Sequence, residues 1–308
     1  MAHLATREAY GEALAVLGAE HDFLVLDADL SKATYTMKFA GKYPERFFNM
    51  GISEGDLMTT AAGIASTGKT VFASTFAMFA AGRAYEQIRN SIAYTGLNVK
   101  IGATHGGILI GEDGASHQCM EDISLMRTIP GMTVIVPCDQ YSVYLAVKAA
   151  LEHEGPVYLR FGRTSSEPVY TEGNAVFEIG RGHVLQDGED VAIFAIGDMV
   201  AESWKAAWIL KERGVSAAVI DMASVKPLDR ELVEHYAAKT GRIITVEDHN
   251  VIGGLGGAIA EVLSETAVAR LRRVGIPDVF GCSGKRQDLA AYFKLNAEGI
   301  LEAFEKFI

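Results

Sequence analysis

Short apolar stretches alternate with longer amphipathic ones along most of this 308-residue chain. In the first half, β-branched and aromatic residues gather in short runs, each followed by turn residues or by a helical spacing of apolar positions. These runs predict strands at residues 23–28, 47–52, 70–75, 98–103, 132–137 and 156–161. Between them lie helix-like stretches such as GDLMTTAAGIAST and AMFAAGRAYEQIRNSIAYT. Strands that alternate with helices favour βαβ units and a mostly parallel sheet.

The alternation stops once and then resumes. Residues 164–180 (TSSEPVYTEGNAVFEIG) lose periodicity and are rich in turn-forming residues, which indicates an interdomain linker. Four further apolar runs follow and predict strands at residues 190–197, 216–222, 242–248 and 269–276. The sequence therefore predicts an α/β fold with two consecutive open α/β domains, residues 1–168 and residues 169–308.

Composition excludes several functional classes. The net charge of −11, without clusters of Lys and Arg, makes nucleic acid an unexpected partner. No apolar run approaches about 18 residues, and the N-terminal segment lacks the apolar core of a signal peptide, so we expect no membrane association. Cys119, Cys138 and Cys282 have no metal-ligand spacing and no even number for a disulfide framework. These features predict a cytoplasmic protein.

The segment from Ala103 to Pro130 carries the most chemistry. It places His105 and His117 on either side of a glycine-rich loop that contains Glu112 and Asp113, directly after a strand-like run. Ligands of open α/β sheets gather at loops that follow the carboxyl ends of parallel strands. Either histidine alone would be an ordinary loop residue, but both together with a carboxylate indicate a functional site.

Glu54 lies where a strand-like run gives way to an apolar helix, in SEGDLMTTAAGIAS. A carboxylate there is commonly a helix-start residue stabilised by the helix dipole, but in an apolar pocket it could share a proton with a heterocyclic nitrogen. Phe76 and Phe79 would lie on one helical face if the helix has begun by then. Such a pair usually packs in a core, and its more specific use is a stacking platform for a planar ring.

Two arginines occupy places where anions bind. Arg7 lies early in the first predicted helix, and Arg163 follows the strand PVYLRF at its carboxyl end. Both are either solvated charges or anion ligands. The segment GGLGGAIAEVL at residues 253–263 resembles a dinucleotide fingerprint but lacks its third glycine, so glycines that let a helix pack closely on the sheet explain it better.

Together these residues closely resemble one family. The segments ATREAYGEAL, GISEGDLM, STFAMF, THGGILIGEDGASHQ and TVEDHNVIGGLGGA resemble, in this order, the C-terminal section of transketolases. That section consists of the pyrimidine-binding domain of thiamine diphosphate enzymes and the transketolase C-terminal domain. The GDG…N motif that binds Mg²⁺ and the diphosphate in a complete transketolase is missing. The resemblance therefore implies one subunit of a split transketolase, with Mg²⁺ (or Ca²⁺) held by an N-terminal partner subunit.

The resemblance assigns cofactor roles residue by residue. Glu54 and His117 match the catalytic residues: the glutamate that hydrogen-bonds the aminopyrimidine N1′ and the histidine near the reactive carbon. Phe79 matches the ring that stacks on the aminopyrimidine, and Phe76 lines the same pocket. Asp29 matches an aspartate near the cofactor and the subunit interface.

Substrate contacts are implied in the same way. Asp113 matches the carboxylate that reads a substrate hydroxyl, and His117 also contacts the donor hydroxyls. Arg7, His105 and Arg163 match positions that contact the acceptor and its phosphate.

The sequence departs from the family pattern at three positions. Ala33 stands where a hydroxyl residue is usual, Gly82 replaces a tyrosine beside the cofactor pocket, and Gly55 replaces a histidine or glutamine. The substrate is therefore expected to differ from the standard pentose phosphates.

The implied reaction is the transfer of a two-carbon ketol unit from a ketose (phosphate) to an aldose (phosphate). The implied assembly is a heterotetramer with two copies of each subunit, in which this chain also associates with its own second copy. Three alternatives stay open. The beta subunit of a 2-oxo-acid dehydrogenase shares the domain order, although the GEDGASH loop favours a sugar. A deoxyxylulose-phosphate synthase shares the RAYEQ segment. Intact Glu54, Phe79 and His117 argue against the third, a catalytically idle scaffold subunit.

Overall fold

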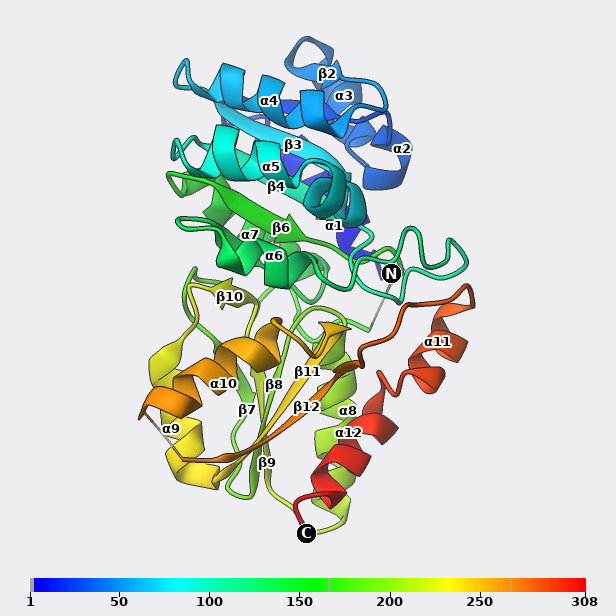
Figure 1. The fold of residues 1–308 in the computed structure, drawn as a ribbon, viewed down its shortest axis with the longest axis vertical. Helices are drawn as coiled ribbons and strands as arrows, with labels where there is room; N and C mark the ends of the chain where they lie inside the picture. Colours follow the sequence, from blue (N-terminus) through cyan, green and yellow to red (C-terminus); the bar gives the residue numbers. More distant parts are fainter. Residues whose placement is uncertain (1–2, 166, 267) are drawn as a thin grey trace.

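Two β-sheets, each with helices on both faces, lie one above the other along the long axis of the molecule (Figure 1). The computed structural model describes residues 3–165, 167–266 and 268–308. The predicted class, α/β with two open sheets, is confirmed.

The larger sheet has seven strands in the order β10-β5-β6-β4-β3-β1-β2. Six of them come from the first half of the chain and pair in parallel, as the alternating pattern predicts. The seventh, β10, comes from the second half and pairs antiparallel with β5. The strands are β1 (Phe23–Asp27), β2 (Phe47–Asn49), β3 (Thr70–Phe76), β4 (Val99–Thr104), β5 (Thr133–Ile135), β6 (Val157–Arg160) and β10 (Ser224–Lys226).

Helices cover both faces of this sheet because its strands alternate apolar side chains to both sides. Helices α1 (Thr6–Leu17) and α7 (Gln140–Glu152) pack on one face against Phe23, Val25 and Phe72. The other face is covered by α4 (Glu54–Ala65), α5 (Tyr85–Gln87), α6 (Asp122–Thr128) and two π-helical segments, η2 (Phe79–Arg83) and η3 (Ile88–Ala93). Short helices after β1 complete this half: α2 (Ser31–Thr34), α3 (Met37–Lys42) and η1 (Pro44–Arg46).

The second sheet has five strands in the order β12-β11-β8-β9-β7, with only β7 antiparallel to its neighbour. Helices α8 and α12 cover one face, and α9 and α10 cover the other. The elements are β7 (His183–Gln186), β8 (Val191–Ala195), α8 (Met199–Glu212), β9 (Ala217–Asp221), α9 (Arg230–Thr240), β11 (Arg242–Asn250), α10 (Leu255–Thr266), β12 (Arg270–Ile276), α11 (Arg286–Tyr292) and α12 (Ala297–Glu305).

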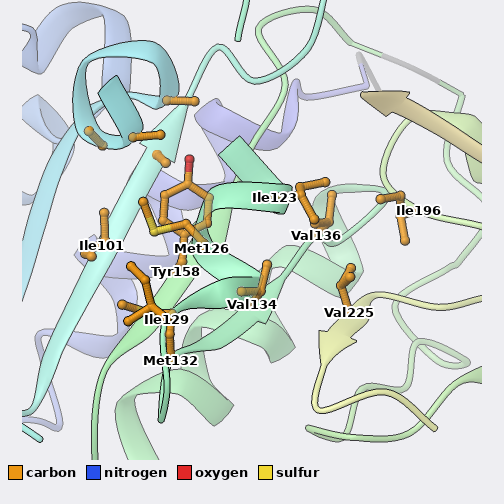
Figure 2. Close-up of a cluster of buried hydrophobic side chains, with 14 of the residues drawn as sticks. Ile101, Ile123, Met126, Ile129, Met132, Val134, Val136, Tyr158, Ile196 and Val225 are labelled. Atoms are coloured by element: carbon orange, nitrogen blue, oxygen red, sulfur yellow. The ribbon is translucent and has the colours of Figure 1, made fainter. Parts of the chain in front are cut away.

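One hydrophobic core continues from the first sheet into the second. Val134 and Val136 lie between Met126 on one side and Ile196 and Val225 on the other, all of them buried (Figure 2). Burial of apolar surface on this scale is the main force that holds the two halves together. The carboxyl end of the first sheet is thereby fixed against the second half of the chain.

The structure differs from the sequence pattern in local detail. Strands β7 and β10 were not predicted, because they are only four and three residues long. The helix-like stretch after β3 is interrupted by the π-helical segments η2 and η3, a departure that periodicity alone does not reveal. Within the described residues, no helix combines the length and the apolar character needed to cross a bilayer.

Candidate active site

The carboxyl ends of β1, β3, β4 and β6 meet at one edge of the larger sheet because these strands are parallel. The loops and helix starts along this edge, together with the start of α1, carry the site residues expected from the sequence. They are Arg7, Asp29, Glu54, Phe76, Phe79, His105, Asp113, His117 and Arg163.

Four rings form a continuous cluster at this edge. Phe76, the last residue of β3, stacks on His105 with ring centroids 3.8 Å apart and on Phe79 at 5.6 Å. His117 approaches edge-on, 5.4 Å from Phe79. No helix has begun at Phe76, so the two phenylalanines do not share a helical face. Their rings meet because the chain turns from β3 into η2.

Glu54 is the first residue of α4 and is only 1% exposed. Its position in the first turn is favourable for a carboxylate because the helix dipole is positive there. Its Oε2 accepts a hydrogen bond from Arg83 Nη1 at 2.7 Å, and the same guanidinium lies 5.1 Å from the centroid of the Phe79 ring. Arg83 therefore links the buried carboxylate to the ring cluster.

His105 is buried and its imidazole is held by two neighbours. Nε2 lies 3.5 Å from Arg7 Nη1, and Nδ1 lies 2.9 Å from Thr104 Oγ1. A guanidinium can only donate, so Nε2 accepts and Nδ1 carries the proton that it donates to Thr104. Burial, reinforced by the charges of Arg7 and Arg163, lowers the pKa of His105 to about 3. The ring is neutral at ordinary pH.

The two arginines converge beside His105. Arg7 Nε donates to the backbone carbonyl of Arg163 at 2.9 Å, and burial lowers the pKa of Arg7. Arg163 donates to the backbone carbonyl of Ile110 and lies 3.6 Å from Asp113 Oδ2. The structure thus brings together four of the five residues expected at the substrate, Arg7, His105, Asp113 and Arg163, while the fifth, His117, lies in the ring cluster.

Asp29 lies apart from that group. It is exposed, has a left-handed backbone with φ of 63°, and accepts a hydrogen bond from Asn49 Nδ2 at 2.8 Å. Among the described residues, no contact joins it to the ring cluster. Its loop position after β1 leaves its side chain facing outward.

Its neighbour Asp27 was not anticipated from the sequence, although it is fully buried at the end of β1. Its carboxylate accepts hydrogen bonds from the Leu30 amide at 2.6 Å and from the hydroxyls of Thr34 at 2.7 Å and Thr36 at 2.9 Å. Burial raises its pKa, and these bonds act in the opposite direction. The threonines in DADLSKATYT are the signal that could have identified this anchor of the loop.

The three departures from the family pattern have different local settings. Ala33 offers its backbone carbonyl, which accepts a hydrogen bond from Arg7 Nη1 at 2.9 Å. Gly55 has room for a side chain, since the nearest atom to a Cβ there would be 3.9 Å away on Gln87. Gly82 is exposed, and a Cβ there would meet only the end of the Met78 side chain, at 2.8 Å.

A residue from the second half of the chain holds the loop that follows His105. Asp248, on β11, accepts hydrogen bonds from the backbone amides of Ile108 at 2.8 Å and Leu109 at 3.1 Å. A Cβ on Gly107 would lie 2.0 Å from Asp248 Oδ2, so only glycine fits there. Burial raises the pKa of Asp248 to about 6, although nearby Arg160 favours its charge. Sequence reasoning gave Asp248 no role, although it lies in the segment TVEDHNVIGGLGGA.

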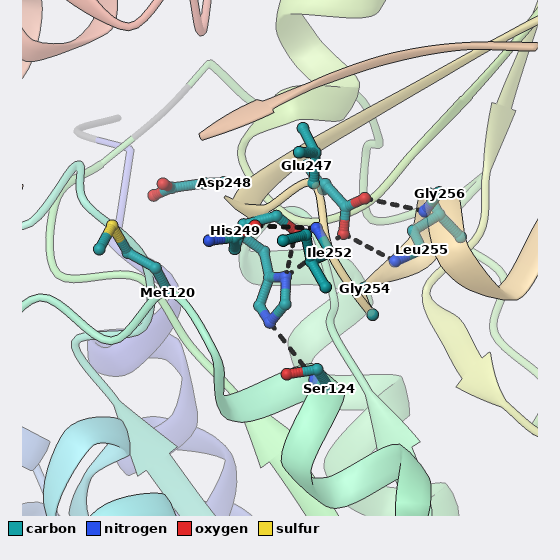
Figure 3. Close-up of polar contacts among 12 residues, drawn as sticks. Met120, Ser124, Glu247, Asp248, His249, Ile252, Gly254, Leu255 and Gly256 are labelled. Atoms are coloured by element: carbon teal, nitrogen blue, oxygen red, sulfur yellow. Dashed lines mark hydrogen bonds and ion pairs between the residues drawn. The ribbon is translucent and has the colours of Figure 1, made fainter. Parts of the chain in front are cut away.

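Its two neighbours on β11 also anchor loops (Figure 3). Glu247 accepts hydrogen bonds from the amides of Leu255 at 2.7 Å and Gly256 at 2.8 Å, at the start of α10. His249 Nε2 accepts from the Ser124 amide at 3.3 Å, across the two halves of the chain. A Cβ on Gly254 would lie 1.9 Å from Glu247 Oε2. The interpretation of the glycine-rich segment as a close-packing feature is confirmed.

No group of three or more His, Cys, Asp and Glu side chains in residues 3–165, 167–266 and 268–308 is placed to hold a metal ion. The site instead combines a buried carboxylate, a ring cluster and a cationic group beside it.

Two family models match the chain. Residues 2–168 match the pyrimidine binding domain of transketolase, and residues 180–300 match the transketolase C-terminal domain.

Proteins described as transketolase chains are similar to this chain over nearly its whole length and nearly their own. A Methanocaldococcus jannaschii protein described as a transketolase C-terminal section is 52% identical over 96% of this chain and 93% of its own. One chain of a 6-deoxy-6-sulfo-D-fructose transketolase from a Clostridium species is 41% identical over 96% of this chain and 92% of its own. One chain of an apulose-4-phosphate transketolase from Phocaeicola vulgatus is 37% identical over 99% of this chain and 98% of its own.

One solved structure has the same fold throughout. It is described as a split-gene transketolase in an inactive β4 tetramer, and it aligns with a TM-score of 0.92 and 53% identity. The alignment covers 98% of each chain.

Proposed function

This chain belongs to the transketolase family, and on that premise we propose that it is the C-terminal subunit of a two-chain transketolase. It would transfer a two-carbon ketol unit from a ketose to an aldose in the cytoplasm. Membership of the family implies dependence on thiamine diphosphate. When bound, this cofactor supplies the carbanion chemistry, and the protein supplies orientation and proton traffic.

The observation that carries the proposal is the pairing of buried Glu54 with the ring cluster. The Glu54 carboxylate is 1% exposed, and the Arg83 guanidinium contacts both this carboxylate and the face of the Phe79 ring. A carboxylate and an aromatic face at this spacing fit a planar heterocycle with a ring nitrogen. Glu54 would hold a proton on the aminopyrimidine N1′, and the low local dielectric would strengthen that charge-assisted hydrogen bond. Phe79 would stack on the ring, and Phe76 would fix Phe79 in place.

The two histidines would contact the sugar substrate. His117 stands edge-on to Phe79, where its imidazole could contact hydroxyls of a sugar held over the cofactor ring. His105 is neutral, so it would donate or accept a hydrogen bond without adding a charge. Asp113 would accept a hydrogen bond from a substrate hydroxyl. Arg7 and Arg163 would bind an anionic group at the far end of the substrate, because forked guanidinium donors suit a dianion.

The cofactor's diphosphate and its Mg²⁺ (or Ca²⁺) would bind to a separate N-terminal subunit. The two similar transketolase chains from Clostridium and Phocaeicola, which match over nearly their own length, support this division. We place the active sites at the interfaces of a heterotetramer with two copies of each subunit. By analogy with the β4 neighbour, this chain without its partner would self-associate and be inactive.

The similar transketolases named for apulose 4-phosphate and for a sulfo-sugar extend the substrate proposal. A phosphate or a sulfonate on the sugar would suit the group of Arg7, His105 and Arg163. Ala33 offers a carbonyl but no hydroxyl to that group, which would shift the anion relative to a standard pentose phosphate.

Reconstitution tests the function directly. The chain is mixed with its N-terminal partner, thiamine diphosphate and Mg²⁺, and ketose donors are screened against aldoses in matched phosphorylated and unphosphorylated pairs. We expect ketol transfer only with both chains present and a higher kcat/KM for the phosphorylated acceptors, because a remote anion contributes binding energy.

Glu54→Gln serves as the matched inactive variant. It keeps the shape but removes the charge, so turnover and C2 proton exchange should fall by about 10²-fold or more while the fold survives. Near-wild-type exchange in this variant would contradict the role of Glu54.

Decarboxylation of pyruvate or another 2-oxo acid in place of ketol transfer would instead support one of the alternative thiamine enzymes. An inactive complex that nonetheless binds the cofactor would support a scaffold role.

A further inference from the structure

Arg83 is a charged residue to which the proposed function gives no role. It ends the π-helical segment η2, and its side chain is 56% exposed. One end of its guanidinium reaches inward, where Nη1 donates to Glu54 Oε2 at 2.7 Å. Of the residues that the structure describes, Arg83 is the one whose side chain donates to this carboxylate. A buried carboxylate without a hydrogen-bond partner is costly, so this contact matters for the site.

The same guanidinium also covers an aromatic face. Its central carbon lies 5.1 Å from the centroid of Phe79. One planar, cationic group therefore makes the two contacts that the proposed function assigns to the aminopyrimidine: an N–H donated to Glu54 and a position over the face of Phe79. A guanidinium resembles an aminopyrimidine in both respects, since it is flat, delocalised and has N–H donors in its plane.

We propose that Arg83 is an internal placeholder for the cofactor's aminopyrimidine. This inference rests on the proposed function. In the cofactor-free chain, Arg83 keeps the Glu54 carboxylate oriented and keeps Phe79 covered. When the cofactor binds, its pyrimidine takes over both contacts and the guanidinium moves outward. Arg83 is thus a positioning residue for Glu54, and it competes with the cofactor.

The surroundings permit this exchange. Because the Arg83 side chain is already about half exposed, its guanidinium can reach solvent without crossing packed atoms. Its neighbour Gly82 is exposed and has no side chain to obstruct the movement. The half-exposed guanidinium is rehydrated when it leaves the buried carboxylate, and we expect the paired form to outweigh the separated form by about one order of magnitude. A stronger pair would block the site, and a weaker one would leave Glu54 without its partner.

The experiment compares cofactor affinity in the assembled two-chain complex. Thiamine diphosphate with Mg²⁺ is titrated calorimetrically into wild type, Arg83→Ala and the control Arg89→Ala. Arg89 lies in the neighbouring segment η3, is exposed, and donates to Asn90 at 2.6 Å. Removal of a competitor should lower the Kd of Arg83→Ala by about tenfold, and Arg89→Ala should match wild type. If Arg83 has only a structural role, Arg83→Ala should bind the cofactor more weakly than wild type or equally well, and either result would overturn the proposal.

A second readout uses the cofactor-free chain. Its Tm should fall in Arg83→Ala but not in Arg89→Ala, because only Arg83→Ala leaves a buried carboxylate without its donor. The rise in Tm on cofactor binding should be larger in Arg83→Ala than in wild type. If Arg83→Ala does not fold, Arg83→Lys replaces it. Lysine keeps the charge but lacks the planar fork, so the Kd should still fall, by less than in Arg83→Ala. A wild-type complex that binds no cofactor would refute the proposed function itself, whereas equal affinity in wild type and variants would refute only the placeholder.

Discussion

At the scale of single residues, His105 combines two constraints that no sequence pattern reveals. Its backbone is left-handed, with φ of 59°, and burial lowers the pKa of its imidazole to about 3. The first constraint turns the ring back onto Phe76 at 3.8 Å, and the second keeps it neutral beside two arginines. A left-handed conformation is uncommon for residues other than glycine, although asparagine, aspartate and histidine adopt it more often than the rest. The chain accepts it here at the expected substrate site.

The lowered pKa predicts a stability cost in acid. The unfolded histidine takes up a proton near its usual pKa of 6.5, whereas folded His105 does so only near 3, so stability falls as the pH drops through this interval. His105→Asn tolerates the same backbone and removes the titrating group. Between pH 7 and pH 5, wild type should lose about 2 kcal/mol more unfolding free energy than this variant.

Urea unfolding of both proteins at the two pH values measures this difference. An equal loss in wild type and His105→Asn would mean that His105 titrates normally in the folded chain.

Residue types and spacing predicted which positions gather at the site, but not their contacts. Glu54, Phe79 and His117 could be identified because the segments that carry them resemble those of transketolases. Arg83 could not, since its contact with Glu54 depends on the π-helical turn of η2. Asp27 was overlooked because its partners, Thr34 and Thr36, follow several residues later in an irregular loop.

At the scale of elements, β11 connects the second half of the chain to the site. Glu247 and His249 accept hydrogen bonds from backbone amides at the start of α10 and at Ser124 (Figure 3). Asp248, between them, accepts from backbone amides of the loop after His105. Apolar periodicity predicted this strand, but it could not show what the polar end of the strand binds. That information lies in the pairing of Asp248 with the amides of Ile108 and Leu109, about 140 residues away in sequence.

Asp248→Asn tests whether β11 positions the loop after His105. An asparagine can accept from only one of the two amides and turns its NH₂ group toward the other. We expect a loss of about 1–3 kcal/mol in unfolding free energy and faster hydrogen exchange at Ile108 and Leu109. Asp278→Asn, at an exposed position, is the control and should change neither quantity. Unchanged exchange at both amides in Asp248→Asn would show that the loop does not depend on this carboxylate.

At the scale of the whole molecule, one hydrophobic core spans the two sheets, and the second half of the chain also holds the loop that follows His105. Strand β10 joins the larger sheet from the second half of the chain, and its residue Val225 packs against the same core as Val134 (Figure 2). Hydrophobic periodicity predicted two α/β units. It could not show that one strand from the second unit pairs with the sheet of the first, because such a pairing leaves no local pattern in the sequence. The loop that follows His105 therefore depends on residues from both halves of the chain.

We propose that this chain supplies only the pyrimidine side of a composite site. Glu54, Phe79 and the group around Arg7 would act on a cofactor whose diphosphate is held by a second subunit. Calorimetric titration of thiamine diphosphate with Mg²⁺ into the chain alone, and then into the assembled two-chain complex, tests this claim most directly. We expect the complex to bind the cofactor and the chain alone to show no micromolar binding. Micromolar binding to a homogeneous preparation of this chain would contradict it.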